Sequence, residues 1–315
     1  MEFVLLLPGQ GSQRVGMGKD VYDAFPAARD VFREVDDAIN VALSGVMFDG
    51  PADELTRTQN AQPALLAHSA AVWAVLREAI GPSVVAMAGH SLGEFSAYHL
   101  AGAYDLRDAA QLVHRRGTLM LEQGAARPGA MAVVLGVLTT PIDAICAQAS
   151  EEAGVVVAAN YNSGEQVAIS GTVAGVERAM ELAKAAGAKR CLPLPVSGAF
   201  HSPLMEGAAP GLKRALADVA WSEPSVPVVA NVNAEVVQQA ARARELLLQQ
   251  LTGSVQWIRV MQRLVDLHPH ATFLEIGAGQ VLTGLARRIA PTVKTASCGT
   301  VDEIGTLLTS VGARV

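Results

Sequence analysis

Cysteine is scarce in this sequence, and its spacing follows no ligand or disulfide pattern. Only three cysteines occur among 315 residues, and none belongs to a C-x-x-C pair: Cys146, Cys191 and Cys298. An odd number of widely separated thiols predicts neither a disulfide framework nor a zinc site. We therefore expect a cytoplasmic protein without a metal centre.

Basic runs and long apolar runs are also lacking. The net charge is −6, and no Lys/Arg run with interleaved aromatic residues appears, which argues against nucleic-acid binding. The first residues lack the cationic start of a signal peptide. Residues 58–76 carry no charge, but polar residues interrupt them, whereas a membrane span needs roughly 20 mostly apolar residues. We expect a buried helix there and no membrane association.

The sequence does contain a large apolar fraction and an alternating pattern of elements. Half of the residues are hydrophobic, enough for about two domains or for one large domain with an insertion. Strand-like and helix-like segments alternate from a strand at 3–7 and a helix at 21–40 to a helix at 107–122. This alternation predicts an α/β fold class with a mostly parallel sheet.

The order of predicted elements changes in the middle of the chain. Between residues 131 and 196 the pattern predicts the order βαββαβ, which is typical of ferredoxin-like domains. After Ser197 the earlier alternation resumes, with a helix expected at 203–220 and a strand at 226–231. We therefore expect an α/β-hydrolase-like core of residues 1–125 and 198–315, with a ferredoxin-like inserted domain at 126–197.

One pentapeptide, Gly89-His90-Ser91-Leu92-Gly93, fits the G-x-S-x-G pattern of a nucleophilic serine. Its glycines let the chain turn sharply from a strand, here 84–88, into a helix, here 94–101, and hold the serine hydroxyl clear of the backbone. The helix N-terminus favours developing negative charge, and the Leu92 N–H points where an oxyanion would form.

A serine nucleophile needs a base, and His201 is the best candidate among the seven histidines. It lies in Val196-Ser197-Gly198-Ala199-Phe200-His201-Ser202-Pro203, where small residues and a following helix start indicate a loop. Functional residues gather on such loops. The alternative is an ordinary hydrogen-bonded loop histidine.

Arg116 stands out by its helical position. At about 100° per residue it shares one narrow face with Ala109, Val113 and Met120, whereas Arg115 points away. A buried guanidinium must meet a partner. That partner is either an internal Asp or Glu, or a substrate carboxylate, which arginine binds in a bidentate manner.

The segment Gly9-Gln10-Gly11-Ser12-Gln13 follows the first strand and invites comparison with a dinucleotide-binding loop. Arg14 occupies the position of the third glycine in G-x-G-x-x-G, so the comparison fails. A backbone N–H in this loop could instead supply a second oxyanion donor beside the serine turn.

Five linked motifs together resemble the malonyl-CoA:acyl carrier protein transacylases, in the family's order and spacing over essentially the whole chain. They are Gly9 to Gln13, Gly89 to Glu94, Arg116-Gly117, Ser197 to Ser202, and Gln250-Leu251 with Val255-Gln256-Trp257. The resemblance implies an enzyme that moves a malonyl group from CoA to the phosphopantetheine thiol of an acyl carrier protein, in fatty-acid or polyketide synthesis. It implies an acyl-serine intermediate. Malonyl-CoA would be a substrate, and no cofactor is implied.

Carried over by position, the resemblance implies Ser91 as nucleophile and His201 as base. The Gln250 main-chain carbonyl would orient the imidazole, which suits a sequence in which no aspartate stands out as a third member. The backbone N–H groups of Gln10 and Leu92 would form the oxyanion hole.

The resemblance also assigns substrate contacts. Arg116 would hold the malonyl carboxylate, and Phe200 resembles the malonyl-selecting version of its loop. One departure is Gly277-Ala278-Gly279-Gln280, which replaces the more usual Gly-Pro-Gly-Lys and removes a cation. Two alternatives remain: an α/β-hydrolase-type esterase or thioesterase, and a non-catalytic subunit that docks carrier protein.

Overall fold

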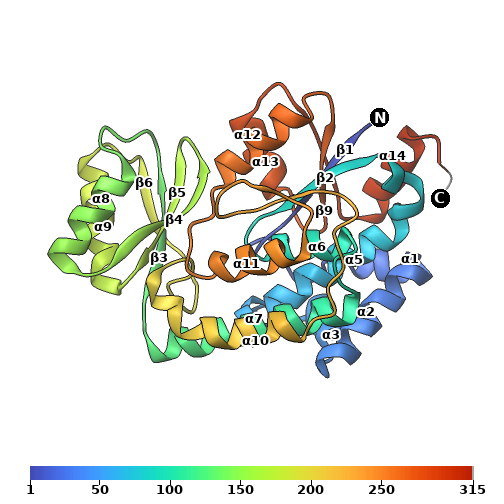
Figure 1. Cartoon of the computed structure of the whole chain (residues 1–315), viewed down its shortest axis with the longest axis horizontal. Coiled ribbons are helices and arrows are strands. Elements are labelled where there is room, and N and C mark those ends of the chain that lie inside the picture. The colour runs from blue at the N-terminus through green and yellow to red at the C-terminus, as the bar shows by residue number, and fades with distance from the viewer. Residues whose placement is uncertain (314–315) are drawn as a thin grey trace.

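The protein consists of a larger and a smaller α/β body that lie side by side (Figure 1). We describe residues 1–313 from a computed structural model. The larger body is built around a six-stranded sheet and the smaller around a four-stranded sheet. The predicted α/β class with a mostly parallel sheet is confirmed.

Every neighbouring pair of strands in the six-stranded sheet is parallel except the last. The order is β10 (Lys294–Cys298), β9 (Thr272–Ile276), β1 (Phe3–Leu7), β2 (Val84–Gly89), β7 (Val228–Val229) and β8 (Val236–Val237), with β7 and β8 antiparallel. All five residues of β1 are apolar and buried. Such a run is typical of a central parallel strand that is covered on both faces.

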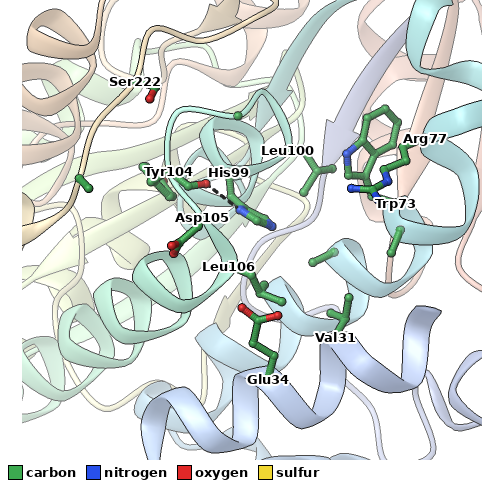
Figure 2. Close-up of a pocket in the computed structure, with 14 residues that line it drawn as sticks. Val31, Glu34, Trp73, Arg77, His99, Leu100, Tyr104, Asp105, Leu106 and Ser222 are labelled. Carbon is green, nitrogen blue, oxygen red and sulfur yellow. Dashed lines mark hydrogen bonds between the residues drawn. The ribbon is translucent and has the colours of Figure 1, made fainter. Parts of the chain in front are cut away.

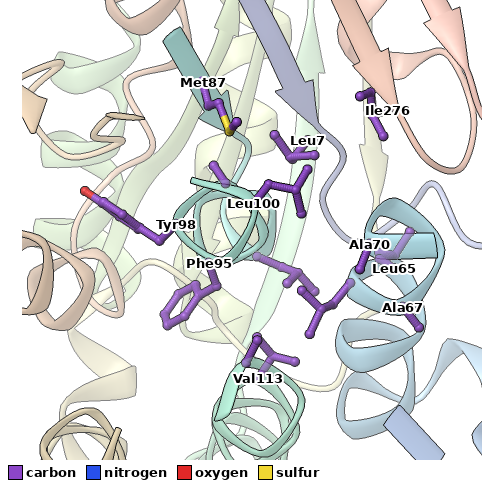
Figure 3. Close-up of a cluster of buried hydrophobic side chains, with 14 of the residues drawn as sticks. Leu7, Leu65, Ala67, Ala70, Met87, Phe95, Tyr98, Leu100, Val113 and Ile276 are labelled. Atoms are coloured by element: carbon purple, nitrogen blue, oxygen red, sulfur yellow. The ribbon is translucent and has the colours of Figure 1, made fainter. Parts of the chain in front are cut away.

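Alternate side chains of β1 enter two different cores, as the two-residue period of a strand requires. Leu5 and Leu7 join the cluster that contains α5 (Thr58–Ile80), α6 (Leu92–Leu100) and α7 (Leu106–Ala126), part of which is drawn in Figure 3. Val4 and Leu6 join the cluster formed with α12 (Trp257–Leu267) and α13 (Val281–Ile289). The sheet therefore carries helices on both faces.

Helix α5 is the buried helix that the uncharged segment predicts. By length and composition it could cross a membrane, but most of its residues lie inside the protein. It packs against α7 and against α2 (Pro26–Ile39). Its apolar character is thus accounted for by the core.

The smaller body has the predicted order βαββαβ. Its elements are β3 (Ala130–Leu135), α8 (Ile142–Ala153), β4 (Val156–Ser163), β5 (Gln166–Gly171), α9 (Val173–Ala185) and β6 (Arg190–Pro193). The strands are antiparallel in the order β4-β5-β3-β6. Val255 of the larger body joins this sheet: its N–H donates to Ala159 and its carbonyl accepts from Tyr161, at 2.8 and 2.9 Å.

Several predicted boundaries were wrong, mostly because of proline. The helix expected at 21–40 is divided into α1 (Lys19–Ala24) and α2, since Pro26 cannot donate a hydrogen bond and begins a new helix. The helix expected at 203–220 begins as the 3-10 helix η2 (Pro203–Ala208) before α10 (Ala209–Asp218). The strand expected at 226–231 pairs only as β7, and β6 ends at Pro193.

The remaining elements complete the larger body. They are α3 (Leu43–Asp49), α4 (Ala52–Thr56), the 3-10 helix η1 (Gly81–Ser83), α11 (Ala240–Gln250) and α14 (Val301–Ser310). The pattern of the sequence did not predict α3 and α4, which are only one to two turns long.

Candidate active site

Ser91 occupies a sharp turn between β2 and α6. Its backbone has φ 50° and ψ −105°, a conformation that a non-glycine residue rarely adopts. A Cβ on Gly93 would lie 2.0 Å from the Leu7 carbonyl oxygen, and one on Gly89 would lie 1.9 Å from the Gly93 carbonyl carbon. Glycine at both positions therefore allows β1, β2 and α6 to pack closely, and this close packing forms the sharp turn that carries Ser91.

His201 lies directly opposite this serine. The Ser91 hydroxyl and His201 Nε2 are 2.7 Å apart, and His201 Nδ1 is 2.9 Å from the Gln250 carbonyl oxygen. That carbonyl is free because Gln250 is the last residue of α11. A carbonyl can only accept, so Nδ1 carries the proton and Nε2 is left able to accept one.

Arg116 reaches the same serine from α7. Its Nη2 donates to Ser91 Oγ at 3.1 Å and to Gln250 Oε1 at 2.9 Å, and its Nη1 donates to Gln62 Oε1 at 2.8 Å. The side chain is 1% exposed. Gly117 permits the approach, since a Cβ there would lie 2.7 Å from the backbone of α5.

The guanidinium is not paired with an internal carboxylate. No ion pair within 4.0 Å involves Arg116 among residues 1–313, so the internal salt bridge left open above is wrong. All three of its hydrogen-bond partners are neutral groups. Burial lowers the pKa of Arg116 to about 10, so it remains a cation at neutral pH.

The electrostatics keep His201 neutral. Burial, and then the positive charge of Arg116, lower the pKa of His201 to about 3. A neutral imidazole is the form that can take a proton from Ser91 at neutral pH.

Sequence reasoning missed three polar residues that support these groups: Gln62, Glu94 and Asn231. The Asn231 side chain accepts from the Ser91 N–H at 2.7 Å and donates to the Gly89 carbonyl at 2.8 Å, which pins the turn. Glu94 contacts Gln250 and Asn231. The sequence held one signal for such a supporting residue. Glu94 is the only acidic residue of α6, and the other residues of that helix are small, apolar or aromatic.

Six of the seven predicted site residues line one cavity of about 240 Å³ between the two bodies, and the seventh, Gln250, contacts His201 through its carbonyl. Its walls include Ser91, His201, Arg116, Phe200, Gln10 and Leu92 from the larger body, and Met131, Asn160, Asn162 and Ala168 from the smaller body. The Leu92 N–H belongs to the first residue of α6 and so has no acceptor within the helix. The cavity can therefore present hydrogen-bond donors beside the serine.

A second, wider hollow of about 660 Å³ lies elsewhere on the larger body, between α2, α5 and the end of α6 (Figure 2). Its histidine, His99, is engaged through Nδ1 with the Tyr104 carbonyl at 3.0 Å. The serine on its wall, Ser222, has no hydrogen bond to that histidine among residues 1–313. In the part of the chain that the structure describes, the only serine hydroxyl that is hydrogen-bonded to a histidine side chain is that of Ser91, with His201.

Comparison with known proteins agrees with this geometry. The family model described as acyl transferase domain matches residues 4–306. Malonyl CoA-acyl carrier protein transacylases of Bacillus subtilis and Escherichia coli are 44% and 42% identical to this chain; each alignment covers 93% of the chain and 92% or 94% of the relative.

Solved structures of malonyltransferases are also similar to this chain over nearly its whole length. An acyl-carrier-protein-S-malonyltransferase from Bartonella henselae has a TM-score of 0.94 at 44% identity, covering 99% of this chain and 100% of its own. A malonyl-transacylase solved in complex with its type II PKS acyl-carrier protein has a TM-score of 0.93 at 40% identity, covering 98% and 100%. This chain belongs to the malonyl CoA-acyl carrier protein transacylase family.

Proposed function

We propose that this protein transfers a malonyl group from CoA to the phosphopantetheine thiol of an acyl carrier protein, in fatty-acid or polyketide synthesis. The observation that carries the proposal is the contact of one serine hydroxyl with both a base and a cation. Ser91 Oγ lies 2.7 Å from His201 Nε2 and 3.1 Å from Arg116 Nη2. A hydrolase has the first contact, but the buried cation suits an acyl group that ends in a carboxylate.

In the first half-reaction His201 Nε2 takes the Ser91 proton while Ser91 Oγ bonds to the thioester carbon. The carbonyl electrons move to the oxygen, and the N–H groups of Gln10 and Leu92 stabilise this oxyanion. When the tetrahedral intermediate collapses, the carbon–sulfur bond breaks and the CoA sulfur takes the proton from His201. The Gln250 carbonyl keeps the imidazole in the required tautomer throughout.

The second half-reaction reverses these steps. The carrier thiol gives its proton to His201 and attacks the malonyl ester, and Ser91 recovers the proton as it leaves. Because one site serves both halves, we expect ping-pong kinetics. Intersecting double-reciprocal lines, which indicate a ternary complex, would contradict the acyl-serine route.

Substrate choice follows from the two remaining groups at the serine. Arg116 fixes the malonyl carboxylate, so that the acyl ester is held where a well-placed thiol reaches the carbonyl. Phe200 is 5% exposed and lines the cavity, where its ring limits the room for a branch on the acyl chain. This supports malonyl over methylmalonyl as the preferred group.

The proposal also includes the fold family of each of the two bodies and the cellular compartment of the protein. The serine turn between β2 and α6 supports an α/β-hydrolase-like core of residues 1–125 and 198–315. The order β4-β5-β3-β6 with two helices supports a ferredoxin-like domain inserted at 126–197. We expect a cytoplasmic enzyme that needs no metal or cofactor and binds neither nucleic acid nor membrane.

The decisive experiment is an intact-mass measurement after mixing the protein with malonyl-CoA in the absence of carrier protein. We expect a single malonyl adduct on the natural sequence and none on Ser91→Ala. Release of CoA without an adduct would favour a thioesterase. If neither CoA nor adduct appears, the protein is a docking subunit and the proposal is wrong.

A further inference from the structure

Glu94 is a buried carboxyl group that the mechanism above does not use. It lies in the first turn of α6 and is 1% exposed. Its Oε2 accepts from Gln250 Nε2 at 2.6 Å and from the Asn231 N–H at 3.1 Å. Its Oε1 is buried and has no hydrogen-bond partner among residues 1–313. An ionised carboxylate with one oxygen unsatisfied is costly at such a site.

A single amide connects Glu94 to the substrate-facing cation. The Gln250 side chain donates to Glu94 through Nε2 and accepts from Arg116 Nη2 through Oε1, at 2.6 and 2.9 Å. Its Nε2 also donates to the Ser91 carbonyl at 2.9 Å. The negative and positive groups thus lie at opposite ends of one oriented dipole, beside the nucleophile.

Few other ionisable groups face Glu94. The charge of Arg116 on α7 acts on Glu94, and the charge of Glu94 acts on Tyr98 of its own helix and on Tyr104 of the loop that follows. The other ionisable residue of α6, His99, is hydrogen-bonded to the Tyr104 carbonyl. Strands β1, β2 and β7 carry no ionisable side chain, and on α5 His68 is hydrogen-bonded to the Gly299 carbonyl while Arg77 and Glu78 are exposed. Arg116 and Glu94 are the two opposite charges that share this buried region.

A malonyl carboxylate would add a second anion to the same cation. Two carboxylates that share one site cannot both ionise freely, and one of them takes up a proton. The malonyl carboxylate would contact Arg116 directly, whereas Glu94 reaches it only through Gln250. Resting on the function proposed above, we propose that Glu94 is a positioning residue that takes up a proton when the malonyl carboxylate binds Arg116, so that malonyl selectivity depends on pH.

The pH range in which malonyl affinity changes, and the sign of that change, follow from the coupling of malonyl binding to proton uptake by Glu94. Burial raises the pKa of Glu94 to about 7, so below that pH it already holds a proton and malonyl binding needs no further one. At higher pH each malonyl group bound takes up a proton, and its affinity falls by up to about tenfold per pH unit. Arg116, with a pKa lowered to about 10, and His201, at about 3, do not titrate in this window.

The test compares malonyl-CoA with acetyl-CoA, since their shared CoA groups contribute equally. Binding is measured by calorimetry on Ser91→Ala, which cannot be acylated, between pH 6 and 8.5. We expect the preference for malonyl to be constant up to about pH 7 and to fall up to roughly tenfold per unit above it. Titrations at pH 8 in phosphate and in Tris should show about one more proton taken up with malonyl than with acetyl.

Two further variants in the same background identify the group responsible. Glu94→Gln should keep a malonyl preference that no longer changes with pH. Glu275→Gln removes another buried carboxyl group, one that accepts from the N–H groups of Leu282 and Thr283, and should leave the pH dependence intact. Proton uptake by the Ser91→Ala protein tests the inference even if Glu94→Gln does not fold.

The outcomes separate this inference from the proposed function. A malonyl preference that stays constant from pH 6 to 8.5, or no difference in proton uptake, overturns the role of Glu94 and leaves the proposed function intact. Retention of the pH dependence in Glu94→Gln also overturns it. If malonyl is not preferred at any pH, the carboxylate clamp at Arg116 is wrong, and the proposed function fails with it.

Discussion

At the residue scale, the site depends on a few side chains with unusual electrostatics. Arg116 is almost fully buried, lies 5.0 Å from the centre of the Phe95 ring, and has only neutral hydrogen-bond partners. A buried cation without an anionic partner is costly. Such a site is favourable for a ligand that brings the missing carboxylate.

Replacing Arg116 tests this directly. Arg116→Ala should lower kcat/KM for malonyl-CoA by about 100-fold or more, because a buried charge-assisted pair is lost, and should change that for acetyl-CoA far less. The matched control is Arg115→Ala, since Arg115 directly precedes Arg116 in the same helix and is exposed. If the Arg116 variant still prefers malonyl over acetyl, the clamp is assigned to the wrong residue.

The low pKa of His201 leads to a second prediction. An imidazole with an ordinary pKa of 6.5 would be only about 3% neutral at pH 5, whereas His201, with a pKa lowered to about 3, stays neutral there. The rate of CoA release at saturating malonyl-CoA should therefore remain nearly constant from pH 8 down to about 5. Stopped-flow detection of free CoA measures it, and a roughly thirty-fold loss at pH 5 would contradict the desolvated base.

At the element scale, the unit that creates the site is a strand, a turn and a helix. The sequence predicted β2, the turn at Ser91 and α6 because glycines at fixed offsets and an apolar run are local signals. It did not predict the split at Phe25 or the short β7, since those ends depend on proline and on backbone partners elsewhere. Element type was therefore more predictable than element length.

The turn should tolerate no side chain at its second glycine. Gly93→Ala should cost about 3 kcal/mol of unfolding free energy and abolish acylation, because its Cβ would overlap the backbone of Leu7 and Pro8. Gly305→Ala is the matched control: it lies in α14 with nothing within 4 Å of an added Cβ, and should stabilise by about 0.5–1 kcal/mol. Urea unfolding of both variants gives the comparison. Equal stabilities would show that β1 and α6 need not approach so closely.

At the scale of the whole molecule, buried ionisable groups couple folding to pH. Burial lowers the pKa of five histidines below 6.5, so the unfolded chain binds more protons than the folded protein as pH falls through that value: His68, His90, His99, His114 and His201. Burial raises the pKa of Glu94 and Glu275 above 4.5, which acts in the opposite direction between 4.5 and their folded values.

These signs predict the shape of the stability curve. Between about pH 6.5 and 4.5 the histidines lower stability on acidification while the two glutamates partly offset them. Below 4.5 that offset ends, and Glu235 and Glu303, whose hydrogen bonds lower their pKa, add to the loss. The Tm should therefore fall most steeply below about pH 4.5. Thermal unfolding at pH 7, 5.5 and 4 measures this, and an equal Tm at 5.5 and 4 would refute it.

Several features of this protein are encoded by neighbouring residues and can be recognised without the structure. The alternation of strands and helices, the glycine-bounded Ser91 and the apolar arc that carries Arg116 are all readable within one or two turns of chain. His201 was the best candidate for the base because of its position in a loop, and the family resemblance implies the same role.

The polar groups that meet around these residues, in contrast, are fixed by the folding of the whole chain. Gln250 contacts Glu94 and Arg116 across 156 and 134 residues of sequence, from three different helices. Contacts over such separations leave no periodicity, because the helices are brought together by apolar packing that fixes the polar partners only once the core is formed. The unpaired state of Arg116 and the burial of Glu94 are therefore properties of the fold, and not of any segment of the chain.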